Sequence, residues 1–377
     1  MKILLITDNH SPQGGGAEKY FFSLKEKLEN HPDIQVFSTG FSSNVSPLWR
    51  LFINPIKYWQ LRKSIKTINP DVIHLHTVKC YMPTILHAVK GYPVVQTTHD
   101  YALICPASWN IHNDLTPCPT GFSVSCFWKH RNHFSFPVYL IFLIIFFRLR
   151  RLTKKVVKHY LPPSPLLANY LTQNGFGPAT YIPPPQSPVN PPTASLASNH
   201  FLFLGQLGKH KGIYCLLEEF AIACKTNPDL KLTMAGRGRE ENNLRKKIKE
   251  LNLANNIALQ NWSTEPAKLY QDATVLIVPS LWQESFGLVT AEAMSHARAV
   301  IGSNRGATAW LVDHEKTGLL FDPAKKGDLA QCILKLASNF DLAKQYGNNA
   351  YEKFKTFPDN EMILREIIEI YKNKKGA

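Results

Sequence analysis

The sequence predicts an α/β protein built from two Rossmann-like domains that face a cleft. The chain has 377 residues, which is long enough for two domains of ordinary size. Short apolar runs alternate with helical segments in both halves, which is typical of parallel sheets covered by helices on both faces. A proline-rich segment at 182–192 lies between the two series and indicates a semi-rigid linker. We therefore expect one domain at 1–185, a second at 186–358 and a closing segment at 359–377.

The first half opens with an apolar strand at 3–7, followed by an amphipathic helix at 17–29. Further strands are expected at 36–39, 72–76 and 94–99. The segment 100–135 is irregular and rich in Cys, His, Trp and Pro. A long loop of this kind is usually functional or mobile, so it is a candidate part of a binding site.

The second half repeats the alternation after the proline-rich segment. Its strands are expected at 201–204, 232–235, 257–259, 275–278 and 299–301. The last expected helix, at about 360–374, is amphipathic.

The formal net charge of the chain is +15, and acidic residues are missing from one long interval. No Asp or Glu occurs between Asp114 and Glu218. Within this interval, an apolar and aromatic block at 136–147 is followed at once by a basic cluster, namely Arg148, Arg150, Arg151, Lys154, Lys155 and Lys158. The pattern fits an anionic membrane surface, and a core helix with a solvated basic end is the alternative interpretation.

Composition and motifs disfavour several other classes of protein. No apolar stretch reaches the roughly 18 residues that cross a bilayer, and acidic and turn residues come too early for a secretory signal. The seven cysteines are scattered, which favours a reduced, cytoplasmic protein or one peripheral on the cytoplasmic face of a membrane. No helix-turn-helix, zinc-finger or RNP-like pattern is present, so no nucleic acid is expected as a partner.

The strongest candidate site follows the apolar strand at 275–278. Glu284 and Glu292 bracket a turn that contains Gly287, and a helix starts after this turn. Free backbone N–H groups and the positive end of a helix make an anion site. Carboxylates on both sides of such a site suit a ligand with hydroxyls flanking a phosphate, as in a nucleotide-sugar.

Two glycine-containing loops and one histidine are further candidates. Gly15 and Gly16 follow the first strand and open a helix, but the loop is not Gly-x-Gly-x-x-Gly, so no dinucleotide cofactor is indicated. Lys211 lies in a glycine-containing loop after the first strand of the second half, where a lysine suits a diphosphate. His99 ends a predicted strand and would point into the crevice where ligands bind. A purely structural role is the alternative for each of them.

A metal site is not expected. The candidate ligands of the irregular loop are Cys105, His112, Cys118, Cys126, His130 and His133. They lack the tight Cys-x2–4-Cys pairs that zinc sites usually show.

The segment Pro-Ser-x3-Glu-Ser-Phe-Gly-Leu-x3-Glu-Ala-Met at 279–294 resembles the donor-site signature of retaining GT-B glycosyltransferases of family 4, also called group 1. Three other segments are similar to this family in the expected order: Gly-Gly-Ala-Glu at 15–18, Thr-x-His-Asp followed by Cys-Pro, and a Gly-x-Leu-x3-Lys-Gly loop at 205–212. The chain departs from the family at Gln206, which replaces an Arg, and at Trp310, which stands where Glu is usual.

The resemblance implies a metal-independent hexosyltransferase without a cofactor. It would move a sugar, with retention, from a UDP- or GDP-linked donor to a hydroxyl of a lipid-linked, polysaccharide or small-molecule acceptor in cell-envelope glycan synthesis. The domain at 1–185 would be the acceptor side, 186–358 would bind the donor, and the last helix would return to the first domain. A noncatalytic homologue that binds nucleotide-sugars or glycans is the alternative, favoured by Gln206 and Trp310.

The resemblance also implies roles for particular residues. His99, Lys211 and Glu284 would be catalytic. The donor would be bound by Gly15, Gly16, Gln206, Lys211, Gly236, Ser285, Phe286, Gly287, Leu288 and Glu292. Within this set, Lys211 and the helix start at 287–288 would hold the diphosphate, Glu284 the sugar hydroxyls and Glu292 the ribose.

Overall fold

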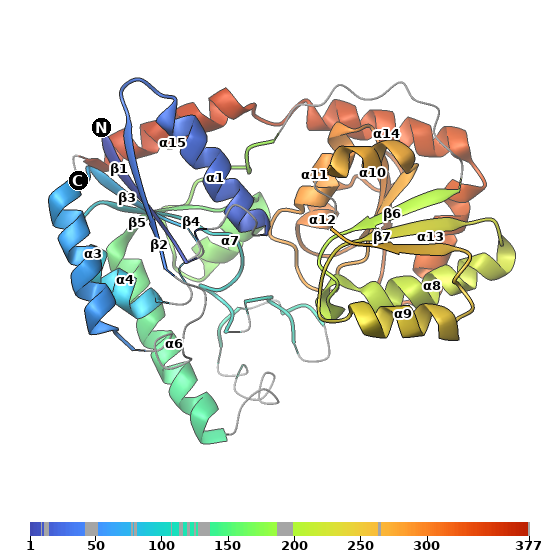
Figure 1. The fold of residues 1–377 in the computed structure, drawn as a ribbon, viewed down its shortest axis with the longest axis horizontal. Helices are drawn as coiled ribbons and strands as arrows, with labels where there is room; N and C mark the ends of the chain where they lie inside the picture. The colour runs from blue at the N-terminus through green and yellow to red at the C-terminus, as the bar shows by residue number, and fades with distance from the viewer. Residues whose placement is uncertain are drawn as a thin grey trace. The chain divides into compact units, whose positions relative to one another are not determined.

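The computed structural model divides into two compact units, each with one parallel sheet covered by helices (Figure 1). Unit 1 comprises Met1–Asp114, Cys118–Pro185 and Pro358–Ala377, and unit 2 comprises Leu115–Pro117 and Gln186–Phe357. The structure describes residues 1–8, 10, 15–41, 52–76, 78, 81–106, 108–112, 116–118, 121–123, 126, 136–186, 199–262 and 265–375. The prediction of two Rossmann-like α/β domains is confirmed.

The sheet of unit 1 has the strand order β2-β1-β3-β4-β5, with all neighbours parallel. Its strands are β1 (Lys2–Thr7), β2 (Gln35–Gly40), β3 (Val72–Leu75), β4 (Val94–Thr97) and β5 (Val157–Leu161). Its helices are α1 (Gly16–Glu29), α3 (Pro55–Ile68), α4 (Met82–Val89), α6 (Phe136–Val156), α7 (Pro165–Gln173) and α15 (Asn360–Lys375). The first four strands match the predicted positions, whereas β5 was not predicted.

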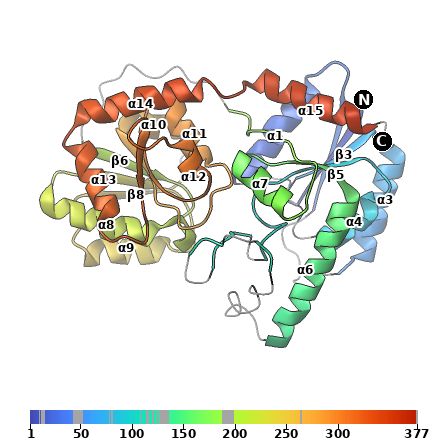
Figure 2. The ribbon, with the colours of Figure 1, turned by 180° about the vertical axis from the view of Figure 1, so that it is seen from behind.

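Alternate residues of β1 enter two different cores of unit 1. Leu4 and Ile6 pack with residues of α3 and α4. Ile3 and Leu5 pack with residues of α1 and α15. Because side chains alternate across a strand, the sheet is the middle layer of an α/β/α sandwich. Figure 2 shows α15 lying against this unit.

The sheet of unit 2 has the order β11-β10-β9-β6-β7-β8, again parallel throughout. Its strands are β6 (His200–Leu204), β7 (Lys231–Ala235), β8 (Ile257–Gln260), β9 (Val275–Val278), β10 (Ala299–Ser303) and β11 (Gly318–Phe321). Its helices are η2 (Lys209–Lys211), α8 (Ile213–Thr226), α9 (Glu241–Glu250), α10 (Pro266–Asp272), α11 (Leu288–Ser295), α12 (Gly306–Leu311), α13 (Asp328–Ala337) and α14 (Phe340–Phe354). The expected strands are confirmed, and β11 is an additional one.

The same alternation builds unit 2. Phe201 and Phe203 of β6 pack with residues of α8 and α9, whereas Leu202 and Leu204 pack with residues of α10 and α11. Figure 1 shows these two pairs of helices on opposite sides of β6 and β7. The order of strands reverses between β6 and β9. At such a switch point the loops that follow the two strands diverge and leave room for a ligand.

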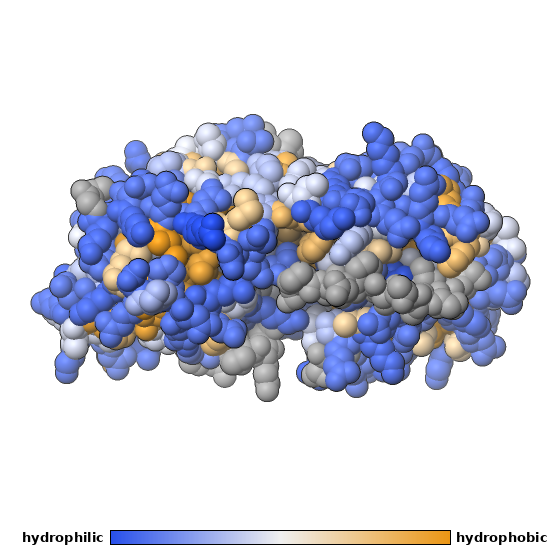
Figure 3. Space-filling view, turned by 90° about the horizontal axis from the view of Figure 1, so that it is seen from above, coloured by the Kyte–Doolittle hydropathy of each residue, from blue (hydrophilic) through white to orange (hydrophobic). Residues whose placement is uncertain are grey.

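The face of the molecule drawn in Figure 3 is mainly hydrophilic and carries small apolar patches, as is ordinary for a protein surface. Among the described residues, no helix combines the length and the apolar composition needed to cross a bilayer.

Candidate functional site

The loop after β9, residues 279–287, is held in place by hydrogen bonds with two other segments of unit 2, the loop after β6 and the end of β10. The backbone N–H groups of Leu281 and Trp282 donate to the carbonyl of His210, at 2.9 and 3.2 Å. Ser303 Oγ donates to the carbonyl of Ser280 at 2.8 Å, and Arg305 Nη1 donates to that of Leu281 at 2.6 Å. The loop is therefore rigidly placed at the switch point between β6 and β9.

Glu284 is buried in this loop, and its Oε1 atom accepts three side-chain hydrogen bonds. The donors are Ser280 Oγ at 2.6 Å, Lys211 Nζ at 2.7 Å and Trp282 Nε1 at 2.9 Å. Burial alone would raise the pKa of Glu284, but the charge of Lys211 and the three hydrogen bonds outweigh it and lower the pKa. The carboxylate is therefore ionised, with Oε2 as the oxygen that these donors leave open.

Gly306 explains how the β10 loop comes so close to Glu284. Its φ is +56°, and a Cβ atom there would lie 2.4 Å from the backbone N of Glu284. The next residue, Ala307, donates its N–H to the carbonyl of Glu284 at 2.8 Å. Only a glycine permits this approach without a shift of the backbone.

Lys211 reaches Glu284 from the loop after β6. The single turn η2 places Lys211 Nζ 2.7 Å from Glu284 Oε1 and 4.8 Å from the centroid of the Trp282 ring. Burial and the charge of Lys211 lower the pKa of the neighbouring His210 to about 4, so this ring is neutral. Lys211 is thus a cation beside the buried carboxylate, with further N–H donors for a ligand.

The helix α11 begins next to this pair and carries Glu292 one turn inside. Its N-cap residue Gly287 has φ +89° and supplies no side chain to cap the helix. Phe286 is buried, while Ser285 and Leu288 are half-buried. Side chains on a helix lean toward its N-terminus, so the Glu292 carboxylate reaches back toward the N–H groups of the first turn. Tyr270 Oη donates to Glu292 Oε2 at 2.8 Å.

The loops after β6 and β7 lie backbone against backbone. A Cβ atom on Gly236 would lie 1.9 Å from the carbonyl oxygen of Gly205, and Leu207 N donates to the carbonyl of Arg237 at 2.9 Å. Gln206 is exposed on this pair of loops. Its uncharged side chain leaves Lys211 as the cation of the 205–212 loop that contacts Glu284.

Trp310, which stands where the family usually has a glutamate, is part of a small core. Its ring stacks on Phe357 with centroids 5.9 Å apart and an interplanar angle of 12°, and it also contacts Phe286. The tryptophan therefore supports the residue that precedes Gly287.

Unit 1 brings three histidines together at the carboxyl ends of β3 and β4. His74 is buried and hydrogen-bonded to Tyr371 Oη at 2.6 Å and Thr97 Oγ1 at 2.8 Å, which is a structural arrangement. His76 Nδ1 lies 3.3 Å from His99 Nε2, and the two rings stack. Burial is the main cause that lowers the pKa of His74 to about 3 and that of His76 well below its ordinary value.

His99 lines a small pocket in unit 1. Polar atoms of three other lining residues, His76 Nε2, Gln96 Oε1 and Thr98 Oγ1, are buried without a hydrogen-bond partner in the part of the chain that the structure describes. Val78, Met82 and Leu103 supply apolar walls. Buried polar atoms without partners are rare in native proteins, so this pocket is suited to a ligand with hydroxyl groups.

The glycine loop of unit 1 lies at the same edge of the sheet. Gly15 is the N-cap of α1 and Gly16 is its first residue, and both are exposed. Residues 11–14 of this loop lie outside the described residues.

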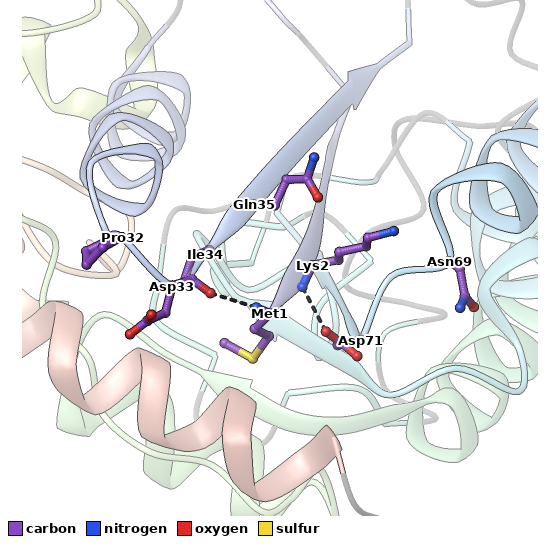
Figure 4. Close-up of a pocket in the computed structure, with 8 residues that line it drawn as sticks. All are labelled: Met1, Lys2, Pro32, Asp33, Ile34, Gln35, Asn69 and Asp71. Carbon is purple, nitrogen blue, oxygen red and sulfur yellow. Dashed lines mark hydrogen bonds between the residues drawn. The ribbon is translucent and has the colours of Figure 1, made fainter.

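A second hollow of unit 1 lies at the opposite, amino edge of the sheet (Figure 4). Lys2 N donates to Asp71 Oδ2 there at 2.8 Å, and Met1, Asp33 and Gln35 are among its other lining residues. Ligands of parallel α/β sheets bind at the carboxyl edge, so we assign no site to this hollow.

The described residues of the Cys- and His-rich segment form no group of three or more side chains placed to hold a metal ion. His130 and His133 lie outside the described residues. Cys118 and Cys126 are buried, and both thiols lie within 3.7 Å of the carbonyl oxygen of Gly121.

Sequence reasoning missed the residues that position the candidate side chains. Ser280 and Trp282, which hold Glu284, lie in the same motif and could have been considered there. Tyr270 lies 22 residues before Glu292 and carries no motif of its own, so no signal pointed to it.

Comparison with known proteins identifies two family models on consecutive parts of the chain. The family described as Glycosyltransferase Family 4 matches residues 14–185, and the family described as Glycosyl transferases group 1 matches residues 192–353. Together the two matches extend over most of both units.

Curated relatives match over less than half of the chain. A poly(ribitol-phosphate) alpha-N-acetylglucosaminyltransferase of Staphylococcus aureus is 27% identical over 162 residues, which are 43% of this chain and 33% of that protein. A D-inositol 3-phosphate glycosyltransferase of Pseudarthrobacter chlorophenolicus is 33% identical over 140 residues, which are 36% of this chain and 33% of that protein.

Solved structures match over nearly the whole chain. A sucrose-phosphate synthase of Thermosynechococcus elongatus has a TM-score of 0.75 at 19% identity, covering 99% of this chain and 98% of its own. Anabaena HepE in complex with UDP has a TM-score of 0.70 at 19% identity, covering 99% of this chain and 100% of its own. At this level of identity the likeness shows the fold, which is that of two parallel-sheet Rossmann-like domains.

Proposed function

This chain belongs to the group 1, family 4-type glycosyltransferases, and we propose on that premise that it transfers a sugar from a nucleoside-diphosphate sugar to an acceptor hydroxyl in cell-envelope glycan synthesis. The proposed donor is UDP- or GDP-linked, and the proposed acceptor is a glycan or a lipid-linked sugar. The names of the relatives support this class of reaction, since one of them acts on poly(ribitol-phosphate) and another on D-inositol 3-phosphate.

The contact between Lys211 and Glu284 beside the start of α11 carries the proposal. A cation and the N–H groups of a helix N-terminus stabilise a diphosphate. A carboxylate next to them can accept hydrogen bonds from sugar hydroxyls, and we assign Glu292, one turn inside α11, to the ribose of the same ligand. HepE, which has a similar fold, has been solved in complex with UDP, which supports a nucleoside diphosphate as a ligand.

We propose a retaining transfer without a protein nucleophile. In this step the acceptor oxygen bonds to the anomeric carbon, the bond from that carbon to the diphosphate breaks, and the acceptor proton passes to the departing phosphate oxygen. Glu284 is a weak nucleophile because the charge of Lys211 and the three hydrogen bonds lower the pKa, and therefore the basicity, of its carboxylate. Lys211 and the α11 N–H groups would stabilise the departing charge, which supports a metal-independent reaction.

For unit 1 we propose that His99, Gly15 and Gly16 contact the bound substrates. His99 lines the small pocket whose other lining residues include Thr98 and Gln96, both with a buried polar atom that lacks a partner among the described residues. Uncharged hydroxyl-rich groups suit such a pocket, because both donors and acceptors are present and His76 stays neutral.

A screen over nucleotides and their sugars tests the proposed function. Calorimetry with UDP, GDP and ADP, followed by their hexose conjugates, should identify one base that binds. Release of nucleoside diphosphate during slow hydrolysis or with candidate acceptors should then be measured. Binding without any turnover would favour the noncatalytic homologue, and absence of binding to every nucleotide would refute both interpretations.

The two glutamates should respond differently to replacement. Glu292→Gln should weaken binding of the plain nucleoside diphosphate, because it removes the charge that accepts from the ribose. Glu284→Gln should depress transfer and affinity for the intact sugar donor, while affinity for the plain diphosphate is kept, because Lys211 retains its charge. Calorimetry on both variants checks this division, and equal effects of both on the plain diphosphate would contradict it.

We also propose that unit 1 binds to the cytoplasmic face of a membrane that contains anionic lipid. Leu140, Ile141, Ile144 and Phe147 of α6 are exposed, which argues against the core-helix interpretation. At the start of α3, Ile56 and Trp59 are exposed by 68% and 69%. α4 contacts both helices, and Figures 1 and 2 show the three next to one another. Apolar side chains with exposed cations beside them suit a lipid surface.

One residue of the predicted basic cluster does not belong to this surface. Arg150 is buried, and its guanidinium donates to the carbonyl of Leu103 at 3.0 Å and to Asn174 Oδ1 at 3.3 Å. Its position on the inward side of α6 follows from the helical period, which a run of basic residues conceals. Arg148, Arg151 and Lys155 are exposed.

The membrane proposal predicts salt-sensitive binding to liposomes that contain anionic lipid. Each cation near such a surface contributes about 1 kcal/mol, so replacing Arg148, Arg151 and Lys155 by Gln should lower the affinity at least about ten-fold. Cosedimentation with liposomes at several salt concentrations measures this affinity. The matched control replaces the exposed cations Arg245, Lys246 and Lys249 of α9 by Gln and should keep binding. Equal binding of neutral and anionic liposomes by the wild type would contradict an electrostatic attachment.

A further inference from the structure

A buried tyrosine lies beneath Glu292 and is not explained by the proposed chemistry. Tyr270 is 1% exposed and comes from α10, a different element from the α11 helix that carries Glu292. Its hydroxyl donates to Glu292 Oε2 at 2.8 Å and lies 3.3 Å from the carbonyl of Val289, one helical turn earlier. The hydroxyl therefore sits against the face of α11 that holds both the carboxylate and the first helical turn.

The tyrosine is itself fixed by its surroundings. Arg298 is buried, and its Nε donates to the backbone carbonyl of Tyr270 at 2.6 Å. The ring of His296 stacks on the tyrosine ring, with centroids 4.9 Å apart and an interplanar angle of 28°. The Nδ1 atom of His296 lies 2.8 Å from the carbonyl of Glu292. The ring of Tyr270 and the backbone of Glu292 are thus both held in place by neighbouring residues.

We propose that Tyr270 is a positioning residue that orients the Glu292 carboxylate for a ribose and so determines the preference for ribonucleoside over deoxyribonucleoside diphosphates. The inference rests on the proposed function, which places the ribose at Glu292. A carboxylate has about four acceptor positions, so the hydrogen bond from Tyr270 to Oε2 helps to fix its orientation and leaves capacity for ribose hydroxyls. Loss of that bond removes one of the contacts that orient the carboxylate, and the ribose must then order it further on binding.

The hydroxyl of Tyr270 is well suited to remain a donor. Burial and the charge of Glu292 hold the pKa of Tyr270 well above its ordinary value, so the hydroxyl stays protonated across the working range of pH. The direction of the hydrogen bond is therefore the same at any pH at which the enzyme is assayed.

The test compares UDP and GDP with their 2′-deoxy and 3′-deoxy counterparts by calorimetry. The wild type should bind the ribonucleotide more tightly, and Tyr270→Phe should reduce this ratio of dissociation constants about five-fold, because the variant keeps the Glu292 carboxylate and loses only a contact that orients it. In a Glu292→Gln background, Tyr270→Phe should change the ratio no further. A purely structural role of the tyrosine would lower the active fraction or the melting temperature and leave the ratio unchanged.

The matched control is Tyr214→Phe, which removes a hydroxyl from another tyrosine–carboxylate pair of unit 2, that of Tyr214 and Glu240. It should leave the ratio at the wild-type value. A wild-type ratio retained in Tyr270→Phe would overturn the inference alone. A wild type that binds nucleotides without preferring ribose would overturn both the ribose role of Glu292 and the inference. A wild type that binds no nucleoside diphosphate would overturn the proposed function.

Discussion

Replacing Lys211 by alanine should weaken the binding of a nucleoside diphosphate by about 1.5–3 kcal/mol, the range for a hydrogen bond to a charged partner. The expected loss is at the upper end for a physical reason. Gln206 supplies no charge where the family has an arginine, so Lys211 bears the electrostatic part of diphosphate binding within this loop. Titration calorimetry of the purified variant with UDP and GDP measures the effect.

Lys209→Ala is the matched control for this prediction. Lys209 belongs to the same single turn but is exposed, and an exposed cation contributes less because solvent screens it. The control should bind within a few-fold of the wild type. An unchanged affinity in a folded Lys211→Ala variant would remove Lys211 from the proposed donor site.

The same replacement should change the dependence of stability on pH. The pKa of Glu284 is lowered in the folded protein, so its ion pair stabilises the fold above the ordinary glutamate range, and this contribution is lost as pH falls through the folded pKa. Without Lys211, burial raises that pKa, which shifts the pH dependence because the part of the loss on acidification that Glu284 causes disappears. Thermal unfolding between neutral and acidic pH would show this shift.

Much of the fold could be predicted from the sequence because its strands are separated by clear turn signals. β1 and β6 each follow the expected apolar run and pair as the parallel pattern predicts. β5 was missed because α6 passes into it at Val156 and Val157 without a glycine or proline between them. β11, Gly318–Phe321, was missed because its short apolar run opens on a glycine, which weakens a strand pattern.

The candidate site was predictable in its parts and not in its contacts. Glu284 and Lys211 were each located by a loop that follows a strand, yet they are 73 residues apart. Their direct contact follows from β6 and β9 being neighbours in the sheet, which local patterns do not encode. The burial of Arg150 and the support of Glu292 by Tyr270 likewise depend on how helices pack.

The distance between the two loops is set by a glycine, Gly212, directly after Lys211. It is the N-cap of α8 with φ +71°, and a Cβ atom there would lie 1.8 Å from the carbonyl oxygen of Pro279. Pro279 precedes Ser280, which donates to Glu284. The close approach of these two backbones therefore places Lys211 within reach of Glu284.

Gly212→Ala should consequently be among the most damaging small substitutions in unit 2. The left-handed conformation costs a non-glycine residue roughly 1–2 kcal/mol, and forcing the loops apart adds about 1–3 kcal/mol. Gly327→Ala is the matched control: Gly327 is also a helix N-cap, with φ +86°, but a Cβ atom there meets nothing within 4 Å. Gly327→Ala should therefore lose only the free energy that the left-handed conformation costs.

Chemical unfolding of both variants measures the two losses of stability. Calorimetry with UDP and GDP should show that Gly212→Ala also loses nucleotide affinity while Gly327→Ala keeps it. Equal destabilisation of the two variants would mean that the β6 and β9 loops can separate freely, and the Lys211–Glu284 contact would then not depend on their close approach.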